Sequence, residues 1–115
     1  MSANCIFCKI AAGKFGGPPV YQDEDVTAFR DINPQAPRHL LLIPNKHIAS
    51  VSEASADDQA LLGKLMLTAA QIAKQEGIDD NGYRLVINSG AHGGQTVFHL
   101  HVHILGGRKM TWPPG

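Results

Sequence analysis

Three histidines near the C-terminus alternate with branched apolar residues in the run His99-Leu100-His101-Val102-His103. In an extended strand successive side chains point to opposite faces, so we expect the three imidazoles on one face, about 7 Å apart between neighbours. An imidazole changes charge near neutral pH and offers both a lone pair and an N–H donor. Such a row suits a nucleophile, a proton donor or a metal ion. A purely structural row is disfavoured, because each buried ring has two nitrogens to satisfy.

A glycine-containing segment, residues 89–96, lies directly before these histidines. Glycines allow backbone N–H groups to turn inward around an anion, and the side chains of Asn88 and Thr96 can add donors. Without its neighbours the segment would be interpreted as an ordinary hairpin connection. Beside the histidines it predicts a phosphate-binding loop, because catalytic groups often lie on loops at the ends of strands.

The elements that would position these groups are indicated by apolar periodicity and by the placement of proline and glycine. Short strands are predicted at residues 20–22, 26–31, 39–43, 83–88 and 99–105, and a short helical turn at residues 5–12. Two prolines within residues 33–37 exclude regular structure there, because proline has no backbone N–H.

The longest predicted element is a helix that begins after Ser55 and ends at Gly77. Ser55 is a favourable helix cap, and the aspartates at positions 57 and 58 suit the positive end of the helix dipole. An apolar stripe at helical spacing marks the face that packs on the core, and it comprises Leu61, Leu62, Leu65, Met66, Ala69, Ile72 and Ala73. Together these elements predict a single α+β domain over residues 1–115, with a five-stranded, mainly antiparallel sheet, one long helix and a short N-terminal helix.

The charges of the chain balance, with ten basic and ten acidic residues. Lysine and arginine form no cluster along the sequence, so nucleic acid is not an expected partner. No apolar run has the length of a membrane span, and the N-terminus lacks the apolar core of a signal peptide. We therefore expect no membrane partner and a cytoplasmic location.

Three stretches of the chain carry a family resemblance. Residues 95–105, with the three histidines, resemble the signature of the histidine triad (HIT) superfamily of nucleotide hydrolases and transferases. Residues 31–37 with His39, and Gly106-Gly107-Arg108 followed by Trp112-Pro113-Pro114-Gly115, resemble its Hint branch of purine nucleoside phosphoramidases. The resemblance extends from Ile6 to Gly115 and implies a HIT-like fold.

The resemblance also implies a reaction and a set of catalytic residues. His101 would attack the α-phosphorus of a nucleoside 5′-phosphoramidate, expel an amine and form a nucleotidyl-histidine that water hydrolyses to AMP or GMP. His103 would bind phosphate and help to protonate the amine. His39, the fourth histidine, would relay protons or keep a structural partner. His99 would serve either as a phosphate donor or as a metal ligand, but not as both through one nitrogen.

The same resemblance implies the residues that hold the nucleotide. Asp31 would accept hydrogen bonds from the ribose hydroxyls, although its type and place also fit a turn cap. Asn88, Gly94 and Thr96 would hold the non-bridging phosphate oxygens, with threonine at a position where relatives often have serine. Four residues that from sequence alone fit an ordinary apolar core would line the base, namely Ile10, Phe29, Ile32 and Leu41.

Two cysteines lie three residues apart, Cys5 and Cys8, and are too close in sequence for a disulfide between them to stabilise the fold. With His47 and His99 they would complete a Cys₂His₂ zinc site of the kind found in many bacterial HIT proteins. Hint members that share this chain's C-terminal tail often lack both cysteines, so the tail and the cysteine pair indicate different groups within the family. A redox pair and two small buried apolar side chains are the alternatives.

The C-terminal tail contains the chain's single tryptophan, Trp112, between prolines and glycines that exclude a regular element. The resemblance implies a homodimer whose tail approaches the partner's active site, and a disordered terminus is the alternative. The favoured function is the phosphoramidate hydrolase. Its rivals are a dinucleoside polyphosphate hydrolase, a nucleotide-binding regulatory module with vestigial hydrolysis, and a zinc protein without catalysis.

Overall fold

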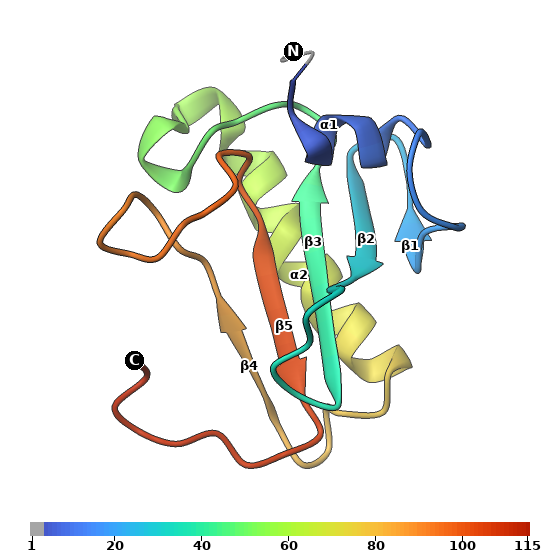
Figure 1. Cartoon of the computed structure of the whole chain (residues 1–115), viewed down its shortest axis with the longest axis vertical. Coiled ribbons are helices and arrows are strands. Elements are labelled where there is room, and N and C mark those ends of the chain that lie inside the picture. The colour runs from blue at the N-terminus through green and yellow to red at the C-terminus, as the bar shows by residue number, and fades with distance from the viewer. Residues whose placement is uncertain (1–3) are drawn as a thin grey trace.

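A single antiparallel sheet organises the part of the chain that the computed structural model describes, residues 4–115 (Figure 1). Its strand order is β1-β2-β3-β5-β4, and neighbouring strands are all antiparallel. The strands are β1 (Tyr21–Gln22), β2 (Val26–Arg30), β3 (Arg38–Pro44), β4 (Tyr83–Val86) and β5 (Val102–Gly106). The predicted α+β class with a five-stranded sheet is confirmed for these residues.

Two α-helices lie on opposite faces of this sheet. The long helix α2 (Gln59–Gln75) packs along one face, where it contacts β3 and β5 (Figure 1). The short helix α1 (Ile6–Ala11) covers one end of the other face, and its Phe7 packs against Leu41 and Ile43 of β3. Two 3₁₀ turns, η1 (Val51–Glu53) and η2 (Ala56–Asp58), connect β3 to α2. The face opposite α2 is therefore only partly covered.

The main core lies between α2 and the sheet. Alternate residues of the central strands, such as Leu40, Leu42 and Ile104, are fully buried there. The predicted helical stripe is confirmed for Leu61, Leu62, Leu65, Ala69, Ile72 and Ala73. It is wrong for Met66, which is 37% exposed, whereas Thr68 is buried. Successive helix residues are about 100° apart, so Met66 turns outward when its neighbour Leu65 faces the sheet.

The start of the long helix follows the predicted cap, with one difference. The Ser55 hydroxyl accepts the Asp57 N–H, and the Asp58 carboxylate accepts the Ser55 N–H, which forms a capping box. This box begins the 3₁₀ turn η2, and the α-helical part follows at Gln59. Gly77, with φ of +76°, ends the helix as predicted.

Strand β5 begins at Val102, so the predicted extended strand is wrong for its first three residues. The ladder with β3 ends at the pair Leu42–Val102, because Pro44 has no N–H to continue it. Before that point the Leu100 N–H donates instead to the Ile48 carbonyl at 2.7 Å. The predicted alternation nevertheless persists, since Leu100 and Val102 are both in the core.

The C-terminal tail follows β5 and returns towards β4 (Figure 1). Arg84 of β4 donates to the Thr111 carbonyl at 2.8 Å, and its guanidinium lies 5.8 Å from the centre of the Trp112 ring. Trp112 remains 80% exposed. Among residues 4–115, no helix combines the length and apolar character that crossing a bilayer requires.

Candidate functional site

A cavity of about 780 Å³ opens on the sheet face that α1 partly covers. Its walls come from α1, from strands β1, β2, β3 and β5, from the loop of residues 13–20 and from the segment before β5. His101, His103, Asp31 and Thr96 contribute the polar side chains that matter for chemistry, and most of the remaining wall is apolar. This size and this mixture of surfaces are typical of pockets for small molecules.

Most of the predicted nucleotide-binding residues lie in this cavity. They are Ile10, Phe29, Asp31, Ile32, Leu41 and Thr96, together with His101 and His103. Asn88 and Gly94 are not among the lining residues, and the Gly94 N–H donates to the Ala91 carbonyl within its own loop. His39 lies behind His103. His99 is fully buried and lies away from the cavity, against α1.

The cavity also contains residues that the sequence did not single out. Phe7 of α1 places its ring 5.1 Å from that of His101, at 90°. Phe15, which is 49% exposed, lines the outer part of the wall on the glycine-rich loop. Phe7 lies one helical turn from Ile10, a spacing that could have indicated a shared face. Phe15 lies in a loop without periodicity, so no sequence signal pointed to it.

The tautomer of His101 is fixed by the backbone. Its Nδ1 lies 2.8 Å from the His99 carbonyl oxygen. A carbonyl can only accept, so Nδ1 carries the proton and donates it. The neutral ring then has its lone pair on Nε2. The residue is only 5% exposed yet contributes to the cavity wall, so this lone pair is the group that a nucleophilic histidine needs.

A chain of hydrogen bonds gives His103 the opposite tautomer. The Gln35 backbone N–H donates to His39 Nδ1 at 3.0 Å, which leaves the His39 proton on Nε2. That Nε2 lies 2.9 Å from His103 Nδ1, which must accept. The remaining proton of a neutral His103 is therefore on Nε2. His101 and His103, whose ring centres are 5.0 Å apart, thus form an acceptor and donor pair.

Burial keeps His103 and His39 neutral at neutral pH. Burial, together with smaller effects of positive charge on His101 and His39, lowers the pKa of His103 to about 4, while the Asp31 carboxylate acts in the opposite direction. Burial also lowers the pKa of His39, although Asp31 Oδ2, 3.4 Å from His39 Nε2, partly opposes this. Because both rings are neutral, the position of each proton is decided by the hydrogen bonds.

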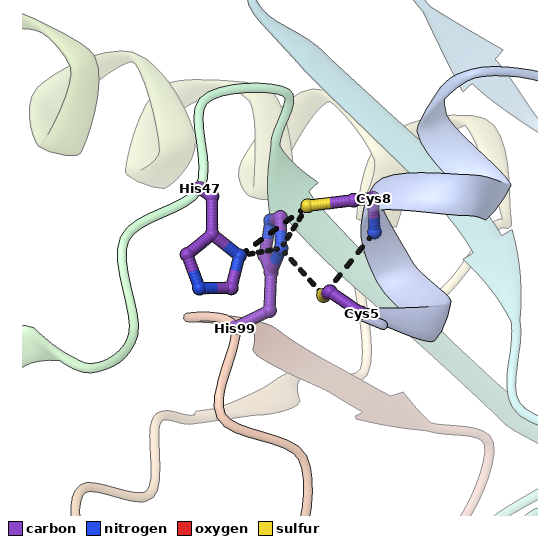
Figure 2. A group of neighbouring side chains, drawn as sticks. All are labelled: Cys5, Cys8, His47 and His99. Carbon is purple, nitrogen blue, oxygen red and sulfur yellow. Dashed lines mark hydrogen bonds between the residues drawn. The ribbon is translucent and has the colours of Figure 1, made fainter. Parts of the chain in front are cut away.

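A second group of side chains, outside the cavity wall, consists of Cys5, Cys8, His47 and His99 (Figure 2). His99 Nδ1 lies 3.3 Å from Cys5 Sγ, 3.5 Å from Cys8 Sγ and 3.2 Å from His47 Nδ1. Cys8 Sγ lies 3.3 Å from His47 Nδ1. Figure 2 shows that the four side chains point towards a common centre from α1, from the loop after β3 and from the segment before β5.

The chemistry of this four-residue cluster fits a metal ion. Tetrahedral zinc with these ligands would separate the donor atoms by about 3.3–3.8 Å, close to the separations found here. His99 Nε2 donates to the Pro44 carbonyl at 2.8 Å, so its Nδ1 presents a lone pair to the cluster. A metal-binding histidine ordinarily makes such a bond through its other nitrogen. The cluster could therefore hold a metal ion.

A third group, Asp31, His39 and His103, also gathers three possible ligand atoms within 4.8 Å. Its hydrogen bonds do not suit a metal. His39 Nδ1 accepts the Gln35 N–H, so the nitrogen that faces the group, Nε2, carries a proton instead of a lone pair. His99 differs, because its Nε2 donates to the Pro44 carbonyl and its Nδ1 therefore presents a lone pair to the cysteine cluster. The group around Asp31 thus suits protons, and the cysteine cluster suits a metal ion.

A model of the HIT domain matches residues 18–110. The chain belongs to the HIT family. An uncharacterized HIT-like protein of Synechococcus elongatus is 55% identical over 115 residues, which is the whole of both chains. The purine nucleoside phosphoramidase of Escherichia coli K12 is 51% identical over 110 residues, which cover 96% of this chain and 92% of the relative.

Solved structures of HIT proteins have the same fold. A HIT family hydrolase from Legionella pneumophila matches with a TM-score of 0.95 and 53% identity, over 97% of this chain and all of that one. A histidine triad protein from Clostridium difficile matches with a TM-score of 0.92 and 41% identity, over 96% of both chains. The expected family and its fold are confirmed, and these relatives support a nucleotide hydrolase of the HIT family.

Proposed function

We propose that this HIT protein hydrolyses purine nucleoside 5′-phosphoramidates at the phosphorus–nitrogen bond through a nucleotidyl-His101 intermediate. The observation that supports this most strongly is the pairing of opposite tautomers in one cavity, with a lone pair on His101 Nε2 and a proton on His103 Nε2. The likeness to the E. coli phosphoramidase supports the choice of substrate.

In the first step of the proposed reaction, His101 Nε2 attacks the α-phosphorus. The new nitrogen–phosphorus bond forms as the bond to the amine breaks, and the amine leaves with a proton from solvent, while the His103 Nε2–H donates a hydrogen bond to the phosphoryl group and helps to orient it. The His101 ring becomes positively charged, and the His99 carbonyl at 2.8 Å stabilises that charge through the Nδ1–H. In the second step water adds to phosphorus, the bond to His101 breaks, and water releases one proton to solvent, which leaves AMP or GMP and restores the neutral His101 ring.

The nucleotide would lie along the cavity with its phosphate at the histidines. The Thr96 hydroxyl would donate to a non-bridging oxygen, and Asp31 would accept from the ribose hydroxyls. The base would lie among Ile10, Phe29 and Leu41, with the remaining apolar wall from Phe7, Phe15 and Ile32. Asn88 would add a phosphate donor at the edge of the site. Gly94 would act through its left-handed φ of +84°, because its N–H is already bonded.

We further propose that the ion held by Cys5, Cys8, His47 and His99 is zinc. Two thiolates and two imidazole nitrogens are its usual tetrahedral ligands. Such an ion has no open position for substrate and is structural. It would fix α1 and the loop after β3 against the segment that contains His101. The catalytic residues described above act without any step on this ion.

Assembly and location follow the family expectation. We propose a cytoplasmic homodimer in which the edge strand β4 and the exposed Trp112 belong to the interface region. Strand β4 pairs only with β5 among the described strands, which leaves its outer edge available. An exposed edge next to an exposed tryptophan is typical of a surface that a second chain covers.

Turnover of adenosine 5′-phosphoramidate, compared with a diadenosine polyphosphate under the same conditions, tests the proposed function. A phosphoramidase should release AMP from the first substrate at least about a hundredfold faster, since a single lost transition-state contact already costs that much. Faster cleavage of the diadenosine polyphosphate would favour the rival hydrolase. Binding of AMP without turnover of either compound would favour a regulatory module.

A further inference from the structure

Gln95 is a buried amide that joins three separate segments of backbone around the site. It is only 5% exposed. Its Oε1 accepts the Gly90 N–H at 2.9 Å. Its Nε2 donates to the Ala49 carbonyl at 2.7 Å and to the Val97 carbonyl at 3.1 Å. Both amide protons and one oxygen lone pair are therefore used, and all three partners are main-chain groups.

Gln95 makes two hydrogen bonds with Gly90, and together they close the tight loop of residues 90–95. The Gln95 backbone N–H also donates to the Gly90 carbonyl at 3.1 Å, so one residue is bonded to both polar groups of the other. Gly90 and Gly94 have φ values of +79° and +84°, which side-chain-bearing residues rarely adopt. A Cβ at Gly93 would lie 2.7 Å from the Ser89 carbonyl oxygen. The loop thus has one tight shape that its glycines permit and Gln95 holds.

The other two bonds connect this loop to the segment that follows His47 of the cysteine cluster and to the segment that contains Thr96 of the cavity wall. Ala49 lies two residues after His47, a member of the cysteine cluster. Val97 lies between Thr96, which lines the cavity, and the histidine run. A bond to its carbonyl fixes the orientation of the Val97–Phe98 peptide, one residue beyond Thr96, and so holds the backbone on that side of Thr96. Gln95 itself points inward, while Thr96, its neighbour in sequence, faces the cavity.

We propose that Gln95 is a positioning residue for phosphate recognition, which holds Thr96 in place towards the histidine pair through these three backbone bonds. The inference rests on the proposed function, because it assumes that a phosphate occupies the His101 end of the cavity. It concerns a residue outside the cavity wall, which acts only through the backbone it binds.

The test separates phosphate binding from nucleoside binding in the intact protein. Gln95→Met keeps much of the side-chain length and removes every hydrogen bond. Adenosine and AMP affinities are measured by calorimetry for the wild type and the variant. The AMP affinity should fall about tenfold or more, as for loss of an aligned donor to a charged group. The adenosine affinity should stay within about twofold, because the apolar wall is unchanged. Gln71→Met, on an exposed face of α2, is the matched control and should leave both affinities as they are.

A second variant covers the case in which Gln95→Met does not fold. Gln95→Glu keeps the acceptor for Gly90 but, when ionised, faces the Ala49 and Val97 carbonyls without a proton. Its carboxyl should ionise only at raised pH, because burial and two carbonyl dipoles oppose the charge. When protonated it regains one donor. The AMP affinity of this variant, divided by that of the wild type at the same pH, should therefore rise as the pH falls from 8 towards 6.

Two results would overturn the assignment. One is an equal loss of adenosine and AMP affinity in Gln95→Met, which would indicate general loosening of the fold. The other is a pH-independent ratio in Gln95→Glu. Neither readout depends on turnover, so a wild type that binds AMP but hydrolyses no phosphoramidate would refute the proposed function and leave the role of Gln95 to be decided by the affinities.

Discussion

At the scale of single residues, the neighbours of each histidine decide what its ring can do. His99 donates to a carbonyl through Nε2 and presents Nδ1 to the cysteines. His101 donates through Nδ1 and has a lone pair on Nε2. His103 accepts on Nδ1 and keeps its proton on Nε2. In the proposed function one residue type thus supplies a metal ligand, a nucleophile and a hydrogen-bond donor within five positions of the sequence.

A pH dependence of stability follows from the lowered pKa values of His103 and His39. The pKa of His103 is about 4 in the folded chain against 6.5 for a solvated imidazole. Between these values the unfolded chain binds more protons than the folded one, so the free energy of unfolding should fall as the pH drops from 6.5 towards 4. Burial shifts the pKa of His39 in the same direction. Chemical denaturation at several pH values measures this slope.

The matched variant for this pH dependence is His103→Gln, which removes the titrating group. Its unfolding free energy should change less over the same pH interval than that of the wild type. An unchanged slope in the variant would show that other groups produce the acid sensitivity and that His103 is not held neutral by the fold.

The sequence indicated most of the candidate residues that line the cavity, but it did not indicate the hydrogen bonds around each of them. The alternating histidines and the two cysteines were identified because their types and spacing are unusual, whereas Asp31 was identified only through the family resemblance. The proton positions could not be predicted, since they depend on Gln35 N–H and the His99 carbonyl, which only the folded backbone brings into place. Gln95 was not identified as a site residue for the same reason, because its partners are backbone groups of distant segments.

At the scale of elements, short connections contribute more to the site than regular structure. His99 and His101 precede β5, and His47 follows β3. The end of the β3–β5 ladder near Pro44 explains this arrangement, because the backbone beyond it bonds to the His47 loop instead. Sequence periodicity predicted the strands but not where their ladders end, which depends on the partner strand.

Removal of the proposed zinc ion should destabilise the connection between α1 and the sheet. In Cys8→Ala the cluster loses one ligand, so zinc content measured by plasma emission should fall from near one ion per chain to near zero. The melting temperature should drop by on the order of 10 °C, because binding free energy at such a site is folding free energy. His92→Ala, at an exposed histidine outside the cluster, should retain the ion. Wild-type protein without stoichiometric zinc would contradict the assignment of the cluster.

At the scale of the whole molecule, the main core and the candidate site lie on opposite faces of the sheet. The face under α2 holds the main core, and the opposite face holds the cavity and the cysteine cluster. The class of fold was predictable because each element has a clear periodicity. The cavity was not predictable from periodicity, since it forms where α1 and the loop of residues 13–20 leave part of one sheet face uncovered.

The proposed homodimer is tested at this scale. Light scattering should give twice the chain mass at micromolar concentration. Trp112→Ala, which removes the exposed ring beside the edge strand β4, should shift the protein towards the monomer, because an exposed tryptophan is typical of a surface that a partner covers. Leu67→Ala, at an exposed side chain on α2, is the control and should leave the mass unchanged. A wild type that is monomeric at all concentrations would contradict the proposed assembly.

The central claim, that His101 Nε2 becomes bonded to phosphorus, is tested most directly by rapid acid-free quenching of a single turnover followed by peptide mass spectrometry. Adenosine 5′-phosphoramidate should yield a peptide that contains His101 and carries one adenylyl group, and the group should disappear at the rate at which AMP is released. His101→Asn should bind AMP and form no adduct. A wild-type enzyme that turns over the substrate with no adduct, or with the adduct on His103, would contradict the account.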